Sequence, residues 1–256
     1  MNTYDFTLDT LKEAGVLLMR LRSEAFETLD KDGDPRNIVT SVDLAVNDFI
    51  TRRIQSEFPD HAIHSEEAAT IGEATHVWSI DPIDGSSNFS RGIPHFAMCL
   101  GLSVDGVPTV GGVLNPVTNE LFSFKKGEGA FLNGAPIRVS EVRELKSAFV
   151  FFHTGRKPEL WQWGGESYSK LLEHAKKTSN FGSTSLDTCF VAAGRIEASV
   201  YGTFSTLDIA SAVGILTEAG GIMADANGEP VELSNTVQKV YTVNNQEILD
   251  QLRAIV

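Results

Sequence analysis

Two carboxylates stand three residues apart in the stretch best suited to chemistry, residues 78–89 (Trp-Ser-Ile-Asp-Pro-Ile-Asp-Gly-Ser-Ser-Asn-Phe). An apolar strand leads into Asp81, and the proline that follows prevents an immediate helix. Asp84 comes one turn later, so both carboxylates can face the same space at the end of the strand. The Gly-Ser-Ser segment at 85–87 then offers backbone N–H groups and hydroxyls where a helix could start, and a helix N-terminus attracts anions.

This combination of groups predicts a metal ion as well as an anion. Two carboxylates beside an anion site repel the anion unless a cation lies between them. We therefore expect a divalent metal between Asp81, Asp84 and a phosphate group. The competing interpretation is an Asx-type turn in which Asp84 only caps the following helix.

Three further acidic positions favour the metal. Glu66 follows a short apolar segment, Asp208 opens a predicted helix, and Asp43 lies in the first turn of another. Each has an ordinary alternative role: a solvated turn, an N-cap, and an acid that stabilises the helix dipole, respectively. All the candidates offer oxygen ligands, which favours Mg²⁺ or Mn²⁺. The six histidines show no zinc-ligand spacing.

The composition is that of a globular, acidic protein. The chain has 256 residues, of which 42% are hydrophobic, and 21 basic against 34 acidic side chains give a net charge of −13. These proportions exclude a disordered chain, and the negative charge argues against binding to a nucleic-acid polymer or an anionic membrane. The length allows one large domain or two small ones.

Cysteine usage and the N-terminal residues favour a cytoplasmic protein. Cys99 and Cys189 lie in apolar stretches and are expected to be buried, reduced thiols. The N-terminal segment carries Asp5, Asp9 and Glu13, the wrong charge for a signal peptide. No apolar run approaches the ~18 residues of a membrane span.

Hydrophobic spacing and turn residues predict a mixture of helices and strands. Helices are expected over residues 4–26, 40–58, 159–176, 184–193 and 208–219, and strands over 76–80, 95–104, 107–114, 120–124, 130–132, 148–152, 177–181 and 196–201. The charged segment 27–37 is expected to be a loop. The strands from 95 to 132 are typical of an antiparallel meander, and polar residues 136–146 mark a predicted boundary between two subdomains.

Three motifs of this chain are similar to those of one protein family. Residues 81–89 resemble the Asp-Pro-Ile-Asp-Gly-Thr-x-Asn-Phe signature of the inositol monophosphatase family, with Ser86 in place of the threonine. The Ser-Glu-Glu at 65–67 resembles its Gly-Glu-Glu element. Residues 207–212, followed by Glu-Ala-Gly-Gly at 218–221, resemble its Trp-Asp-x-Ala-Ala-Gly element. The motifs match in order and spacing, and the resemblance covers nearly the whole chain.

The resemblance implies a fold and an activity. The fold would be α+β, a five-layer αβαβα sandwich of the inositol monophosphatase and fructose-1,6-bisphosphatase type, usually a homodimer. Residues 1–143 would form an N-terminal metal-binding subdomain, and residues 144–256 a C-terminal subdomain that completes the active site. The activity would be Mg²⁺-dependent hydrolysis of a small phosphate monoester, inositol monophosphate or a similar polyol or sugar phosphate, by a metal-activated water.

The resemblance also implies a role for each matching residue. Two or three Mg²⁺ ions, or Mn²⁺, would be held by Glu66, Asp81, the backbone carbonyl of Ile83, Asp84 and Asp208. Glu66, Ser86 and Asp43 would orient the attacking water, and the N–H groups of Gly85 and Ser86 would bind the phosphate. The substrate would contact Asp84, Gly85, Ser86, Ser87, Gly182, Ser183, Thr184 and Tyr201. The alternative for residues 182–185 is an ordinary helix N-cap, and segment 27–37 would correspond to the family's mobile loop.

Departures from the family pattern concern the substrate. The glutamate that binds inositol in the family falls at Tyr201, the tryptophan before the metal-binding aspartate is Leu207, and the glycine of Gly-Glu-Glu is Ser65. Histidinol phosphate, fructose 1,6-bisphosphate or an adenosine 3′,5′-bisphosphate, on whose ring Tyr201 could stack, are therefore alternative substrates. A catalytically silent relative that binds a metal or a partner is a further alternative, against which the complete acidic set argues.

Overall fold

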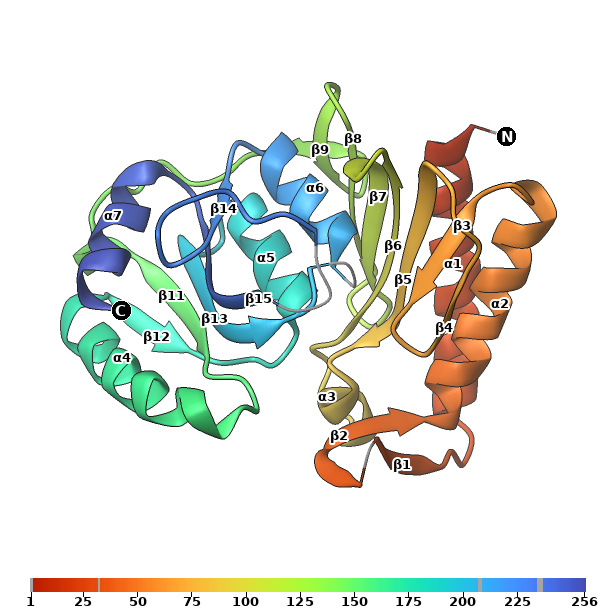
Figure 1. The fold of residues 1–256 in the computed structure, drawn as a ribbon, viewed down its shortest axis with the longest axis horizontal. Helices are drawn as coiled ribbons and strands as arrows, with labels where there is room; N and C mark the ends of the chain where they lie inside the picture. Colours follow the sequence, from red (N-terminus) through yellow and green to blue (C-terminus); the bar gives the residue numbers. More distant parts are fainter. Residues whose placement is uncertain (1, 32, 207–208, 234–236) are drawn as a thin grey trace.

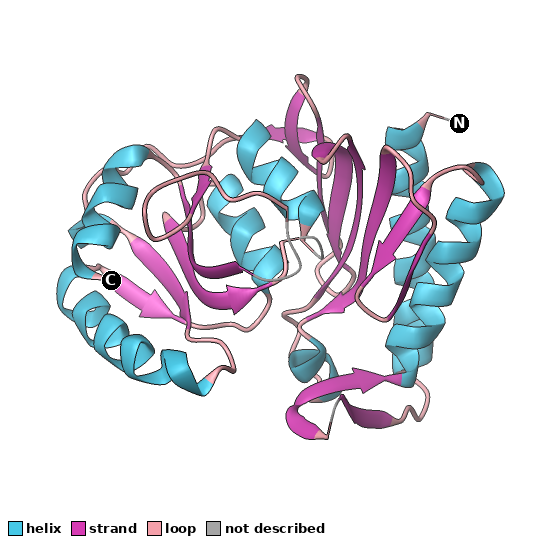
Figure 2. Cartoon of the chain, viewed as in Figure 1, coloured by secondary structure: helices cyan, strands magenta, loops and turns pink. Residues whose placement is uncertain are grey.

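Helices and sheets alternate in five layers across the part of the chain that the computed structural model describes, residues 2–31, 33–206, 209–233 and 237–256 (Figure 1). Two helices cover the outer face of one sheet, two helices lie between the sheets, and two more cover the outer face of the second sheet (Figure 2). This order is the αβαβα sandwich that the resemblance implies, so the predicted fold class is confirmed.

The first outer layer consists of α1 (Thr3–Arg22) and α2 (Ser41–Glu57). Leu11 and Leu18 of α1 are fully buried, because their spacing places them on the face that packs on the sheet. The prediction of a loop over residues 27–37 is wrong: β1 (Thr28–Lys31) and β2 (Asp34–Thr40) form an antiparallel hairpin there. Most of β1 is exposed to solvent, so the hairpin shows none of the apolar alternation by which half-buried strands are recognised.

The first sheet has eight strands among the described residues, in the order β10-β9-β8-β7-β6-β5-β3-β4. Their bounds are β3 Ala62–Ser65, β4 Ala68–Ile71, β5 His76–Asp84, β6 Ala97–Val104, β7 Val107–Asn115, β8 Glu120–Lys125, β9 Gly129–Leu132 and β10 Ala135–Ile137. The antiparallel meander predicted between residues 95 and 132 is confirmed by β6 to β9. β3 runs parallel to β5, and the short helix α3 (Ser86–Ser90) follows β5 directly.

The second sheet has the order β12-β11-β13-β15-β14 in the described part of the chain. Its strands are β11 Phe149–His153, β12 Lys177–Ser179, β13 Ala198–Phe204, β14 Ile222–Ala224 and β15 Val237–Val243. The 3-10 turns η1 (Leu145–Ser147) and η2 (Pro158–Leu160) precede β11 and α4. The outer helices are α4 (Trp161–His174) and α7 (Gln246–Ile255), and the helices between the sheets are α5 (Thr184–Ala192) and α6 (Ala210–Glu218).

Two glycines allow the middle layer to approach the first sheet. A Cβ added to Gly111 of β7 would lie 2.9 Å from Ser211 Cβ, and one added to Gly101 of β6 would lie 3.1 Å from Ser211 N. The missing side chains therefore let α6 pack closely on these strands. The buried cluster formed here includes Phe122 of the first sheet and Val240 of the second. The two sheets fall on either side of the predicted subdomain boundary at 143/144, yet one core joins them.

The two cysteines are free thiols and are both fully buried, as expected. Within the described residues, none of the helices combines the length and apolar character needed to cross a lipid bilayer.

Candidate active site

A bulge at the end of β5 turns both signature aspartates to the same face of the sheet. Asp81 is paired with Cys99 of β6 and Asp84 with Ala97, so three steps on β5 match two on β6. Residues three apart in a regular strand point to opposite faces, and one extra residue restores the same face. The shared orientation expected for these two carboxylates therefore comes from the bulge rather than from a helical turn.

Asp84 reaches from the first sheet to the start of α5. Its Oδ2 accepts hydrogen bonds from Ser183 Oγ at 2.6 Å and from the N–H of Ser185 at 2.7 Å, and its Oδ1 accepts from the N–H of Thr184 at 3.2 Å. Ser185 Oγ also donates to Oδ2. Ser183 is the N-cap of α5 and is fully buried, which confirms the N-cap alternative for residues 182–185. Asp84 thus satisfies helix N–H groups that would otherwise be unpaired.

Ser86 connects the signature segment to the buried Asp43. Ser86 Oγ lies 2.9 Å from the Ile83 carbonyl oxygen and 3.3 Å from Asp43 Oδ1. Asp43 is fully buried and forms a capping box with Thr40 at the start of α2. Burial raises the pKa of Asp43, and the hydrogen bonds from Thr40 oppose this shift. The structure therefore brings the expected serine–aspartate pair together, and Asp43 also performs the helix-stabilising role that was its alternative.

An ammonium group lies against the Ser-Glu-Glu motif. Lys31, at the end of β1, places its Nζ 2.9 Å from Glu66 Oε1 and 2.5 Å from Glu67 Oε1. Burial opposes the charge on Lys31, but the two carboxylates outweigh burial and raise the pKa of the lysine. Burial also raises the pKa of Glu67 to about 7, although Lys31 lowers it. A cation supplied by the chain itself therefore occupies this edge of the acidic group.

These residues meet at a pocket of about 460 Å³ between the two sheets. Ten of the expected site residues line it: Glu66, Asp81, Ile83, Asp84, Gly85, Ser86, Ser87, Gly182, Thr184 and Tyr201. Asp43 and Ser183 lie fully buried behind the wall, bonded to Ser86 and Asp84 respectively. The predicted ligand Asp208 lies outside the described residues.

Gly85 is the residue that the turn after the bulge requires. Its φ is +93°, and an added Cβ would lie 3.2 Å from the carbonyl oxygens of Gly182 and His95. A side chain at Gly85 would therefore be strained and crowded, and the Ser86 N–H would move with the turn.

The pocket also contains polar residues that the sequence patterns did not indicate: Asn37, His153, Arg156 and Asn180. Arg156 donates from Nη1 to Asn37 Oδ1 at 2.7 Å, which joins the loop after β11 to the β1–β2 hairpin. The available signal was a polar run directly after an apolar strand, because such loops carry binding residues. That signal is too general to select these positions.

Tyr201, the residue at the family's glutamate position, is almost completely enclosed. It is 1% exposed, and its hydroxyl lies 3.2 Å from the Thr184 carbonyl oxygen and 3.3 Å from Thr188 Oγ1. Burial raises the pKa of Tyr201, with Asp187 adding to the shift, so the residue is a neutral phenol. Its ring stacks on that of His153, with centroids 5.2 Å apart and planes 17° apart.

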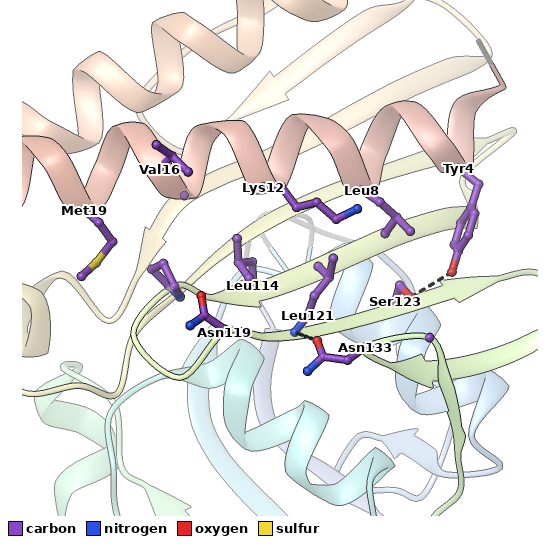
Figure 3. A pocket seen from close by; sticks show the side chains of 13 residues that line it. Tyr4, Leu8, Lys12, Val16, Met19, Leu114, Asn119, Leu121, Ser123 and Asn133 are labelled. Carbon is purple, nitrogen blue, oxygen red and sulfur yellow. Dashed lines mark hydrogen bonds between the residues drawn. The ribbon is translucent and has the colours of Figure 1, made fainter.

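A second hollow of about 790 Å³ lies between α1 and strands β7 and β8 (Figure 3). It shares no lining residue with the acidic pocket. Leu8, Val16 and Leu114 contribute apolar side chains to it, and Lys12 a positive charge. None of the described residues that line it is acidic. This hollow therefore lacks the carboxylates that the predicted chemistry needs.

The oxygen atoms that line the acidic pocket are of the type that binds a hard divalent cation. They are carboxylate and carbonyl oxygens, which Mg²⁺ prefers, and Glu66 already accepts a cationic partner in Lys31. Among the described residues, no three His, Cys, Asp or Glu side chains are already arranged to hold a metal.

Comparisons with known proteins identify the family. The model of the inositol monophosphatase family matches residues 2–256. Inositol monophosphatase 1 of Solanum lycopersicum is 32% identical over 245 residues, 93% of this chain and 88% of that protein. The fructose-1,6-bisphosphatase/inositol-1-monophosphatase of Thermotoga maritima is 30% identical over 256 residues, 100% and 96% of the two chains. The Nus factor SuhB of Pasteurella multocida is 36% identical over 197 residues, 74% and 72% of the two chains.

A solved structure shows the same fold. The Thermotoga maritima IMPase matches with a TM-score of 0.90 and 29% identity, over 100% of this chain and 96% of that one. The family match and the named inositol monophosphatase relatives identify the chain as a phosphatase. The chain belongs to the inositol monophosphatase family, whose members hydrolyse phosphate monoesters.

Proposed function

We propose that the protein is a Mg²⁺-dependent phosphatase that hydrolyses inositol monophosphate or a similar polyol or sugar phosphate. The observation that carries the proposal is the convergence of Glu66, Asp81 and Asp84 with the Gly85–Ser86 turn at one pocket. Carboxylates and anion-binding N–H groups function together when a cation lies between them and a phosphate.

The proposed metal site consists of Glu66, Asp81, the Ile83 carbonyl, Asp84 and Asp208, with two or three Mg²⁺ ions, or Mn²⁺. When bound, such ions activate water and neutralise phosphate oxygens. The Ile83 N–H holds Asp81 Oδ1 at 3.0 Å, so this carboxylate is oriented before any ion binds. The Lys31 ammonium next to Glu66 supports the site, because it shows that this carboxylate accepts a positive partner.

The chain's own groups would orient the reactants. The Ser86 hydroxyl can donate either to the Ile83 carbonyl oxygen or to Asp43 Oδ1. Ser86 and Asp43 can therefore hold a water beside Glu66. The Gly85 and Ser86 N–H groups would bind the phosphate. We propose Ser87, Gly182 and Thr184 as further substrate contacts, because they line the same pocket.

The substrate alternatives from the sequence remain part of the proposal. The Thermotoga maritima relative is named a fructose-1,6-bisphosphatase as well as an inositol-1-monophosphatase, which supports fructose 1,6-bisphosphate as a second substrate. Histidinol phosphate and adenosine 3′,5′-bisphosphate complete the set to be tested.

We also propose a cytoplasmic homodimer. Ile93 and Phe181 are 48% and 49% exposed and are linked through Asn88, whose backbone and side chain bond to them. Two large exposed apolar residues whose backbones both bond to Asn88 support a contact with a second copy in this region. The free thiols of Cys99 and Cys189 support a reducing compartment. Light scattering of the purified protein tests the dimer, and cell fractionation tests the location.

The test of the activity is phosphate release from the proposed esters with and without Mg²⁺. Glu66→Gln removes the charge of a partly exposed carboxylate, and we expect a loss of roughly 100-fold in kcat/KM with only a small change in melting temperature, because Glu67 keeps its ion pair with Lys31. Glu73→Gln is the matched control, because Glu73 is exposed and lies outside the pocket. Absence of turnover of every ester with either Mg²⁺ or Mn²⁺ would overturn the proposal.

A further inference from the structure

The pocket lacks a carboxylate at the position where the family binds the hydroxyls of inositol, and Tyr201 does not replace it. The Tyr201 hydroxyl is engaged with Thr184 and Thr188, and the residue is 1% exposed. The Thr184 carbonyl takes the one O–H donor of this phenol, and burial keeps its oxygen away from a ligand. What Tyr201 offers instead is a flat ring beneath another side chain.

That side chain is His153, the last residue of β11. His153 lies beside Tyr201 in the parallel pairing of β11 with β13, and the two rings are stacked (Figure 1 shows the strands). The imidazole lines the acidic pocket, and its side chain is 15% exposed. Stacking on a buried ring fixes the plane of the imidazole.

A buried carboxylate fixes which nitrogen of His153 carries the proton. His153 Nε2 lies 2.6 Å from Oδ2 of Asp187, a residue of α5 that is 0% exposed. Oδ1 of the same carboxylate lies 3.0 Å from His95 Nε2. A carboxylate accepts hydrogen bonds, so both Nε2 atoms act as donors, and in the neutral form of the His153 ring the lone pair is on Nδ1. No described residue forms a hydrogen bond with that Nδ1.

We propose that His153 recognises the alcohol part of the substrate, and that its Nδ1 accepts a hydrogen bond from a substrate hydroxyl in place of the family's carboxylate. The inference rests on the proposed function, because it concerns the leaving group of the same reaction. A carboxylate can accept from two neighbouring hydroxyls, whereas a single ring nitrogen accepts from one. At this position the pocket therefore offers one acceptor to a substrate hydroxyl where a carboxylate would offer two. Asp187 acts as a positioning residue that holds the Nε2 side of the ring and leaves Nδ1 as the nitrogen available to the substrate.

The test compares two esters that share the phosphate and differ in the leaving group: inositol 1-phosphate and p-nitrophenyl phosphate, which has no hydroxyl donor. His153→Phe keeps an aromatic ring on Tyr201 but removes the acceptor. We expect the ratio of kcat/KM between the two esters to fall roughly 3- to 10-fold, the worth of one neutral hydrogen bond. His153→Asn supplies both a donor for Asp187 and an acceptor oxygen, and we expect it to restore part of the ratio.

A control variant and further measurements separate the possibilities. His174→Phe, an exposed histidine at the end of α4, is the matched control for the substitution. A ratio that falls in Tyr201→Phe but not in His153→Phe would assign recognition to the phenol and overturn the inference. Long-range ¹H–¹⁵N spectra give an independent readout, because the inference requires the proton of His153 on Nε2. If the wild-type protein releases phosphate from none of the esters, both the proposed function and the role of His153 are wrong. If the His153→Phe enzyme is active and its ratio of kcat/KM is unchanged, only the role of His153 is wrong.

Discussion

At the scale of the residue, Asp84 combines a structural and a chemical role. It accepts hydrogen bonds from Ser183, Thr184 and Ser185 at the start of α5, and it also lines the acidic pocket. Sequence reasoning located this aspartate and offered two interpretations, metal ligand and helix cap. Its structural role is to cap a helix, but that helix is α5, about one hundred residues further along the chain. No local sequence pattern can reveal such a contact.

We expect Asp84→Asn to lower both turnover and stability. The amide NH₂ would face donors of α5, so the substitution leaves N–H groups without acceptors at a cost of about 1–3 kcal/mol in the free energy of unfolding. Urea denaturation measures the stability and phosphate release the turnover. Glu66→Gln is the comparison, since it is expected to lower turnover with only a small change in stability. An Asp84→Asn protein as stable as the wild type would contradict the capping role.

At the scale of the element, apolar spacing predicted several helices and strands correctly and missed others. The helices over 40–58 and 184–193 and the meander from 95 to 132 are present, because each buries one face and the burial is visible in the spacing. The hairpin β1–β2 was not predicted, because β1 is mostly exposed. The strand β15 and the helix α7 were missed although both bury apolar residues, among them Val243 and Leu252. The pocket position of His153 depends on the parallel register of β11 with β13, which sequence spacing does not specify.

The same pair of strands gives a test by substitution. A Cβ added to Gly202 of β13 would lie 1.8 Å from the backbone oxygen of Thr154, so Gly202→Ala must displace the end of β11 and the pocket wall. We expect a loss of about 1–3 kcal/mol in the free energy of unfolding. Gly165→Ala in α4 is the control: its added Cβ meets no described atom within 4 Å, and alanine favours the helix by about 1 kcal/mol. Denaturation of both variants should give shifts of opposite sign.

At the scale of the whole molecule, the helices between the two sheets make one cooperative unit. Their buried cluster includes Phe122 of the first sheet, Leu186 and Ile215 of α5 and α6, and Val240 of the second sheet. Separation of the predicted subdomains 1–143 and 144–256 would expose this cluster on both sides. The two halves therefore depend on each other for burial of apolar surface.

We expect a single thermal transition for the full chain, with equal calorimetric and van't Hoff enthalpies. Differential scanning calorimetry provides both values. Two resolved transitions would show that the halves unfold independently, and a folded fragment of residues 1–143 would lead to the same conclusion. The full chain with Gly165→Ala should keep the single transition, because that site lies in the outer layer.

The hydrogen bonds of Asp84 to α5 bear on how such chains change over generations. A descendant that no longer performed hydrolysis would still need the carboxylate to hold its two sheets together, so purifying selection would keep it. If a lineage keeps this aspartate, that shows that the fold needs it and does not show that the protein is still catalytically active. Glu66 is partly exposed and forms an ion pair with Lys31 of the β1–β2 hairpin, so its replacement would be the first sequence change to indicate a loss of activity.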